Sequence, residues 1–324
     1  MAAGKKYLYG PVPSRRLGRS LGVDIVPGPD FVGGGEKEGP PKVCTLDCIY
    51  CQLGRTTQKT IERKDYTAVE PILAELKESL EAGLKADFIT ISACGEPTLN
   101  SSLGEIIDGI KKITDIPVAI LTNGTLFYRQ DVRTDCAKAD VVLPSLDAGD
   151  EQTFRRINRP HSDISIEKLI SGLCEFRKEF SGQIWLEVFL VDGVNTDAAQ
   201  IVKIKDAIAQ IRPDKVQLNT AVRPTPEPQV KKLHPAKLQL IAKQLGAGCE
   251  VVADFSPSRE AEFATSQAET VLSMLKRRPC SLEDICSGLG ISRNEALKYI
   301  THFQSQGVID SEEKGGIIFF KAFS

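Results

Sequence analysis

Short apolar runs alternate with stretches of helical periodicity through most of the chain. In residues 67–80 the apolar side chains recur every three or four positions, and 88–91 follows as an uninterrupted apolar run. Such runs are typical of strands buried on both faces of a sheet. The other strands predicted in this way are 23–26, 118–121, 141–143, 184–190 and 216–218. The helices predicted between them lie near 103–113, 132–138, 166–180 and 198–211.

Strands that alternate with helices predict an α/β fold around a parallel sheet. The hydrophobic pattern alone does not decide between an open, doubly wound sheet and a sheet that closes toward a barrel. In both architectures the functional loops leave the carboxyl ends of the strands. We therefore expect a functional site in the segments that directly follow the predicted strands.

The pattern changes near the C-terminal end. A helix is expected near 269–277, and Ser292, with Glu295 three residues later, forms a capping box at the start of a further helix. Two short apolar runs then flank a double-glycine turn and predict a β-hairpin. Helices followed by a hairpin predict a winged helix-turn-helix domain over 268–324, joined to the α/β core by a linker over 256–267.

The composition is that of a water-soluble globular protein, with 41% hydrophobic and 26% charged residues. No apolar run approaches the roughly 20 residues that cross a bilayer, and no apolar signal segment stands at the start. We therefore expect a cytoplasmic protein without membrane contact. Residues 1–64 carry 11 Lys and Arg against 6 Asp and Glu, and this basic excess would attract an anionic substrate.

Three of the nine cysteines, Cys44, Cys48 and Cys51, form a C-x3-C-x2-C run after the first predicted strand. Three thiolates can hold three irons of a [4Fe-4S] cluster and leave the fourth iron open for chemistry. A C-x2-C pair is also half of a structural zinc site, but such a site needs four Cys or His ligands, and the nearest histidine is His161. A disulfide is disfavoured in a reducing compartment. The spacing favours the cluster.

This spacing, with Tyr50 directly before the third cysteine, resembles the cluster loop of the radical SAM enzymes. The resemblance implies a partial (β/α)6 barrel, a [4Fe-4S] cluster on the three cysteines, and S-adenosylmethionine (SAM) bound at the open iron. An electron from the cluster would cleave SAM and release a 5'-deoxyadenosyl radical. The barrel would comprise a leader, first strand and cluster loop over 1–64 and its remaining units over 65–255.

The resemblance also assigns roles to residues at the predicted strand ends. Cys94-Gly95-Glu96 is similar to the superfamily's glycine-glutamate turn, which receives the ammonium of SAM, although Cys94 stands where glycine is usual. Glu96 and Asp147 are the implied catalytic residues. The residues implied to bind the cofactor are Tyr50, Gly95, Glu96, Thr122, Asn123, Ser145 and Asp147.

Four arginines near the cysteines are candidates for substrate binding. Arg15, Arg16 and Arg19 stand in a leader rich in glycine and proline, which is unsuited to a core and which we predict to be a rigid cationic loop, and Arg55 follows the third cysteine. Our hypothesis is that they line the mouth of the site and bind an anionic group. The alternative is a solvated leader whose arginines pair with nearby acids.

The leader and cluster loop also resemble a group of small Fe-S oxidoreductase-like radical SAM proteins related to the wyosine-type tRNA synthetases. This chain lacks the additional N-terminal cysteines of those synthetases, so the resemblance carries the SAM chemistry and not the tRNA substrate. We expect hydrogen abstraction from an unidentified substrate, which is a small anion, an RNA or a protein. An RNA or protein substrate would dock on the winged-helix domain. A reductase or a flavodoxin- or ferredoxin-type protein would donate the electron.

Two other functions stay open. The winged helix would also suit a DNA-binding regulator that carries an Fe-S cluster, but residues 268–324 hold 7 Lys and Arg against 7 Asp and Glu, whereas a DNA-binding face is usually basic. The cysteine spacing also fits an activase of glycyl-radical enzymes. Nothing in the sequence identifies the partner that such an activase would need.

Overall fold

The computed structural model describes residues 7–26, 28, 30–31, 37–38, 41–222, 225–246, 248–252, 267–289, 291 and 293–323. Within these residues one large sheet runs in the order β1-β2-β7-β8-β9-β10-β11-β12. Its strands are β1 (Leu8–Ser14), β2 (Gly18–Asp24), β7 (Phe88–Ser92), β8 (Val118–Leu121), β9 (Val141–Leu143), β10 (Gln183–Leu190), β11 (Lys215–Thr220) and β12 (Cys249–Val251). Two short pairs lie apart from it: β3 (Asp30–Phe31) with β4 (Lys37–Glu38), and β5 (Val43–Cys44) with β6 (Gln58–Lys59).

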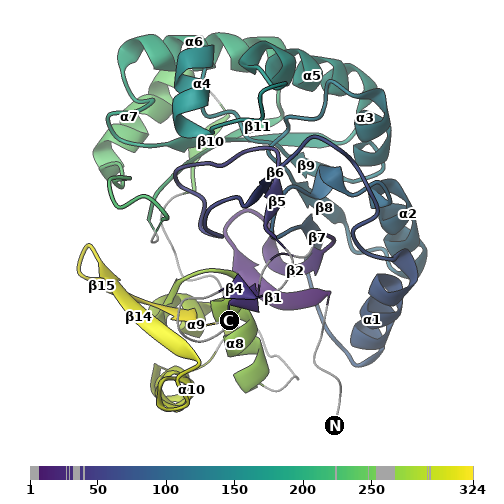
Figure 1. Cartoon of the computed structure of the whole chain (residues 1–324), viewed down its shortest axis with the longest axis vertical. Helices are drawn as coiled ribbons and strands as arrows, with labels where there is room; N and C mark the ends of the chain where they lie inside the picture. The colour runs from purple at the N-terminus through teal and green to yellow at the C-terminus, as the bar shows by residue number, and fades with distance from the viewer. Residues whose placement is uncertain are drawn as a thin grey trace.

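Every neighbouring pair from β2 to β12 is parallel. The helices that connect these strands are α1 (Val69–Glu81), the 3-10 turn η1 (Pro97–Leu99), α2 (Leu103–Ile113), α3 (Gln130–Cys136), α4 (Glu151–Ile157), α5 (Ile166–Glu179), α6 (Ala198–Ile211) and α7 (Pro235–Leu245). Figure 1 shows these helices around the outside of a curved sheet, with the β5–β6 pair on the inner side. A parallel sheet covered on its outer side is consistent with a partial barrel. None of the helices in the described ranges is long and apolar enough to span a bilayer.

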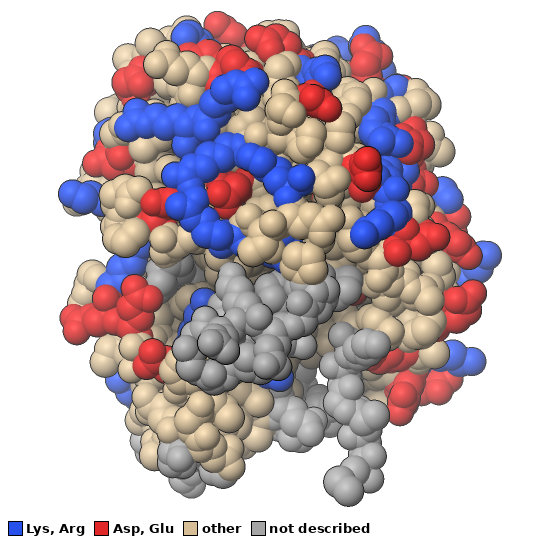
Figure 2. Space-filling view, in the orientation of Figure 1, with Lys and Arg blue, Asp and Glu red and all other residues tan. Residues whose placement is uncertain are grey.

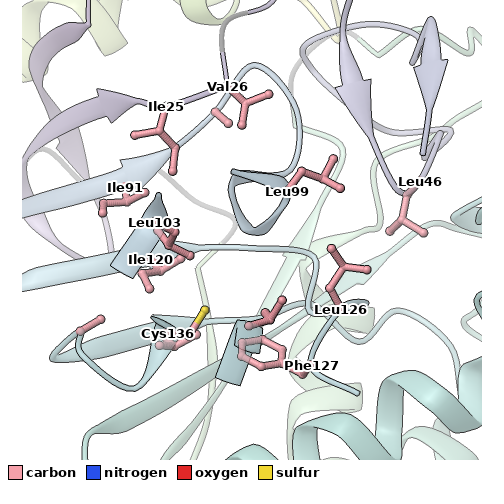
Figure 3. Close-up of a cluster of buried hydrophobic side chains, with 14 of the residues drawn as sticks. Ile25, Val26, Leu46, Ile91, Leu99, Leu103, Ile120, Leu126, Phe127 and Cys136 are labelled. Atoms are coloured by element: carbon pink, nitrogen blue, oxygen red, sulfur yellow. The ribbon is translucent and has the colours of Figure 1, made fainter. Parts of the chain in front are cut away.

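The main core lies between the strands and the outer helices. Ile91 of β7 and Ile120 of β8 are fully buried there together with Phe127. Leu46 of the cysteine loop belongs to the same core, and Figure 3 shows it on the side of Leu126. Burial of a leucine side chain stabilises a fold by roughly 1.5–3 kcal/mol. Apolar packing therefore fixes the cysteine loop to the barrel.

The C-terminal part forms a second, smaller core. Its elements are α8 (Gln267–Arg277), β13 (Cys280–Ser281), α9 (Leu282–Leu289), α10 (Arg293–Ser305), β14 (Ile309–Lys314) and β15 (Ile317–Ala322). The three strands form an antiparallel sheet in the order β13-β15-β14. Helices α8 and α9 also contact β1, and Val12 of that strand packs against this core. The order of helices and hairpin is the predicted one, while assignment to the winged-helix class stays a prediction.

The leader differs from the prediction, because it forms strand β1 instead of a loop. β1 pairs antiparallel with β2 at the end of the sheet, with an irregularity between Tyr9 and Val12. Proline is tolerated in such an edge strand, where one row of backbone groups needs no partner. The first parallel strand also starts earlier than expected, at Gly18. The predicted linker, apart from Gln267 at the start of α8, lies outside the described residues.

Candidate functional site

The cysteine loop leaves the carboxyl end of β2 and is held by backbone hydrogen bonds to the end of α4. The N–H groups of Asp47 and Ile49 donate to the carbonyls of Asn158 and Ile157 at 2.9 and 3.0 Å. Cys51 closes a turn on Cys48, with its N–H donating to the Cys48 carbonyl at 3.2 Å. The loop is thus ordered by contacts that do not involve its sulfurs.

Each of the three sulfurs receives a nitrogen donor from a different part of the chain. Lys42 Nζ lies 3.0 Å from Cys51 Sγ. Asn123 Nδ2, after β8, lies 3.6 Å from Cys44 Sγ, and Asn158 Nδ2, at the end of α4, lies 3.4 Å from Cys48 Sγ. Donors to a thiolate stabilise its charge, so this arrangement suits sulfurs that bind metal in the deprotonated form.

The donor set fits a cluster with one open iron. Burial raises the pKa of the Cys44 thiol to about 11 and that of Cys48 well above its ordinary value, so both would be protonated without metal. In the described part of the chain, no three His, Cys, Asp or Glu side chains converge on a single ion. A cubane does not require such convergence, because each thiolate binds its own iron. Three thiolates, each with a nitrogen donor near its sulfur, can therefore hold three irons of such a cluster.

Glu96 lies at the neighbouring strand end, fully buried. Its Oε1 accepts hydrogen bonds from the Thr98 N–H at 3.0 Å and from Thr122 Oγ1 at 2.5 Å. Its Oε2 accepts from the Asn123 N–H at 2.8 Å. Burial raises the pKa of Glu96, although these donors oppose the shift. The predicted Glu96, Thr122 and Asn123 are therefore brought together next to Cys44.

The turn that carries Glu96 packs directly against the cysteine loop. The Glu96 N–H donates to the Val43 carbonyl at 3.1 Å. A Cβ on Gly95 would lie 1.6 Å from the same oxygen, so this position excludes any side chain. Cys94, in contrast, directs its sulfur toward Asp24 Oδ2 at 3.2 Å.

The half-buried Tyr50 and the buried Asp147 form a second group beside the cysteines. The Tyr50 ring stacks on Phe189 of β10, with centroids 3.9 Å apart, and its hydroxyl donates to Asp147 Oδ2. Asn158 Nδ2 donates to that oxygen at 2.8 Å, and the Phe189 N–H donates to Oδ1 at 2.8 Å. Burial raises the pKa of Asp147 to about 6 against these donors. Both oxygens of Asp147 have protein partners, one of them Tyr50, and the catalytic role predicted for Asp147 stays a prediction.

Ser145 precedes Asp147 by two residues in the sequence. It forms an isolated parallel bridge with Glu187 of β10 and is half-buried. Its place after β9 is the predicted one.

One of the leader's arginines, Arg19, lies elsewhere than predicted. Because β1 and β2 form a hairpin, their turn lies at the amino end of β2, opposite the cysteine loop. Arg19 pairs there with Asp87, which precedes β7, at 2.6 Å. Arg15 donates to the carbonyl of Val252. Arg19 therefore does not lie at the mouth of the site, and an exposed acid is its partner.

Arg16 and Arg55 lie closer to the candidate site. Arg16 Nη1 pairs at 2.7 Å with Glu187, whose charge also acts on Tyr50. Arg55 pairs with Asp47 at 2.9 Å and with Glu227. Figure 2 likewise shows basic and acidic side chains interleaved over much of one face.

Sequence reasoning missed four residues of this region. Lys42 and Asn158 contact the sulfurs, Glu187 pairs with Arg16, and Glu227 pairs with Arg55. In the sequence, Lys42 could have been noticed as a charged residue directly before the apolar Val43. The other three stand in segments without a recognisable motif.

A shallow hollow adjoins Cys51 on the side of the C-terminal part. The barrel side contributes Cys51, Gln52, Gly54, Thr225 and Pro226. The opposite wall is formed by Pro279, Glu312, Phe319 and Lys321. One candidate cluster ligand thus faces the β14–β15 hairpin.

Comparison with known proteins identifies the family. The family model described as the Radical SAM superfamily matches residues 40–204. The GTPase Obg of Brachyspira hyodysenteriae is 36% identical over 316 residues, which are 97% of this chain and 45% of that protein. This chain therefore spans less than half the length of that relative. A UPF0026 protein of Methanocaldococcus jannaschii is 32% identical over 321 residues, 96% of this chain and 94% of that protein.

A solved structure agrees with the fold. The structure of TYW1 with a lysine-pyruvate adduct bound superposes with a TM-score of 0.51 and 22% identity, covering 70% of this chain and 72% of that chain. At this identity the likeness concerns the fold alone. Together with the match over residues 40–204, these findings show that the chain belongs to the radical SAM superfamily.

Proposed function

We propose that this protein is an enzyme that binds a [4Fe-4S] cluster through Cys44, Cys48 and Cys51 and cleaves SAM reductively. The observation that carries the proposal is the bridge made by Asn123. Its backbone N–H donates to Glu96 and its side-chain Nδ2 contacts Cys44 Sγ. A buried carboxylate is thereby held beside a cysteine of the proposed cluster. Because SAM carries an ammonium group, a carboxylate is a suitable partner for it there.

One electron supplied through the bound cluster would cleave SAM into methionine and a 5'-deoxyadenosyl radical, which abstracts hydrogen from the substrate. Glu96 would bind the ammonium, held in place by its bonds from Thr122 and Asn123. Gly95 would let the backbone lie close to the cysteine loop. Tyr50, oriented by Asp147, and Ser145 would form the wall around the nucleoside and exclude water.

The substrate in this proposal is an anion, an RNA or a protein. Arg16 and Arg55 would supply positive charge near the site. Residues 268–324 would form a winged helix-turn-helix, which three helices and the β13-β15-β14 sheet support. Its hairpin borders the hollow beside Cys51, which supports a role in docking the substrate or the reductase-, flavodoxin- or ferredoxin-type electron donor. We place the reaction in the cytoplasm, where a reducing medium protects such a cluster.

The test is anaerobic reconstitution with iron and sulfide, followed by dithionite and SAM. We expect about four irons per chain and formation of 5'-deoxyadenosine, measured by liquid chromatography. Cys48→Ser should reduce the product to background. Cys174→Ser, which removes a half-buried thiol on α5, is the matched control and should behave as wild type.

Glu96→Gln separates SAM binding from cluster binding. The variant should keep its iron and bind SAM about 10- to 100-fold more weakly, the effect of losing a charged hydrogen-bond acceptor. Zinc in place of iron, or a loaded protein that forms no 5'-deoxyadenosine, would refute the proposal. A loaded protein that forms no 5'-deoxyadenosine but binds DNA specifically would favour the alternative function of a DNA-binding regulator.

A further inference from the structure

Lys42 is a buried lysine that directly precedes the cysteine loop. Its side chain is almost fully enclosed, with 3% of the residue exposed. Its ammonium lies 3.0 Å from Cys51 Sγ and 2.6 Å from the Gly54 carbonyl oxygen. Lysine is among the residues least often buried, because its charge loses hydration there unless a partner compensates. Here the partners are a sulfur and a carbonyl.

The other two sulfurs face neutral donors. Cys44 and Cys48 each receive a side-chain amide, from Asn123 and Asn158. The three candidate ligands therefore have unequal surroundings, and among the side chains that the structure describes only Cys51 has a cation in contact. Asn amides donate hydrogen bonds but carry no net charge, so Lys42 adds a property that the amides lack.

A positive charge at this place affects the energy of an electron on the cluster. Reduction potentials of Fe-S clusters depend on net charge, hydrogen bonds to the sulfurs and exposure to solvent. Reduction adds one negative charge, which a nearby cation stabilises. Because Lys42 is buried, water and salt screen its charge less than that of a surface lysine.

We propose that Lys42, through its contact with Cys51, raises the reduction potential of the cluster held by this loop. The inference rests on the proposed function. In the step concerned, one electron passes from an external reductant, dithionite in the test, to the oxidised cluster, and no bond forms or breaks. Lys42 is a positioning residue here, since it acts through Cys51 and touches no reacting atom.

The test is a potentiometric titration of the reconstituted protein without SAM, followed by EPR of the reduced cluster. Lys42→Met, of similar length but uncharged, should shift the midpoint to a more negative potential. Lys42→Gln keeps an N–H donor and should shift it in the same direction, which separates charge from hydrogen bonding. Lys42→Arg keeps the charge and should stay close to wild type. Lys59→Gln is the matched control, because Lys59 is exposed and donates to the carbonyls of Arg159 and Pro160.

An unchanged midpoint in Lys42→Met with full iron content would overturn the inference. Loss of iron from both neutral variants, with Lys42→Arg fully loaded, would also overturn it, because Lys42 would then be required for assembly. Failure of the proposed function is distinct, since wild type itself would then hold no reducible cluster or form no 5'-deoxyadenosine. The titration does not depend on SAM cleavage.

Discussion

At the scale of single residues, the packing of Gly95 explains why the Cys94-Gly95-Glu96 turn can carry a cysteine at position 94. In the superfamily's glycine-glutamate turn, glycine is usual at the position of Cys94. The close approach to the Val43 carbonyl falls on Gly95, and Cys94 has room for its sulfur beside Asp24. Position 94 therefore does not need glycine in this chain. The sequence identified the turn, but only the packing shows which of its positions meets the cysteine loop.

Gly95→Ala should loosen the cysteine loop. The added methyl would meet backbone of the loop, which cannot rotate away as a side chain can, so we expect a loss of stability of about 1–3 kcal/mol and less iron per chain. Gly83→Ala is the control, because Gly83 has a φ of +88° but no atom within 4 Å of an added Cβ. It should lose about 1 kcal/mol through backbone strain and keep its iron. Denaturant unfolding and iron analysis measure both; equal iron loss in the two variants would contradict the packing argument.

Asp147 should make stability depend on pH. Its pKa in the fold is about 6, above the value of about 3.9 for an exposed aspartate, since burial penalises the charged form. The folded state therefore binds the proton more tightly, and stability rises as the pH falls from 7 toward 5. Asp147→Asn lacks this titration. Wild type should gain up to about 1.4 kcal/mol per pH unit relative to the variant, measured by urea unfolding of the metal-free proteins. A constant difference would reject the shifted pKa.

At the scale of elements, the apolar runs predicted the parallel strands well because strands buried on both faces leave a continuous signal. β1 was missed, since an edge strand with glycine and proline has no such signal. That omission changed the place of Arg19, because a loop can reach the mouth of the site, whereas the turn of a hairpin lies at the opposite end of β2. α7 and β12 also went unpredicted, and β12 is only a short run at the sheet end.

Arg277 of α8 joins the C-terminal part to the barrel. Its Nη2 pairs with the buried Asp24 at the end of β2 at 2.8 Å, and its guanidinium lies over the Tyr9 ring at 3.9 Å. Arg277→Met would leave the carboxylate buried without its cation and should cost about 3 kcal/mol of stability. The exposed neighbour Lys276 serves as the control, and Lys276→Met should change stability by less than about 0.5 kcal/mol. Chemical denaturation measures the free energy of unfolding of both variants. Similar values would show that the Arg277–Asp24 pair contributes little to stability.

At the scale of the whole molecule, the family and the α/β core could be predicted because a cysteine motif and the strand ends agree in order. The partners of the buried polar groups could not be predicted. Lys42 meets Cys51 and Arg16 meets Glu187 only after the chain has folded, and these pairs leave no periodic pattern.

Removal of the proposed cluster should leave the barrel folded. The apolar cores of the barrel and of the C-terminal part contain long-range contacts that do not pass through the sulfurs, and Leu46 and Ile49 hold the loop independently. Small metal-dependent domains, in contrast, unfold without metal. Circular dichroism of metal-free protein should show native helix content and cooperative thermal unfolding. A non-cooperative transition would mean that the cluster is needed for folding.

Strand β1 ends the large sheet, and α8 and α9 pack against it. An uncovered edge strand offers backbone groups to any other chain with a free edge, which promotes aggregation. A shortened protein that stops after the barrel would uncover this strand and the apolar Val12. Material for biochemical work on the barrel should therefore be produced with its C-terminal part attached, since the barrel alone would tend to pair with itself and precipitate.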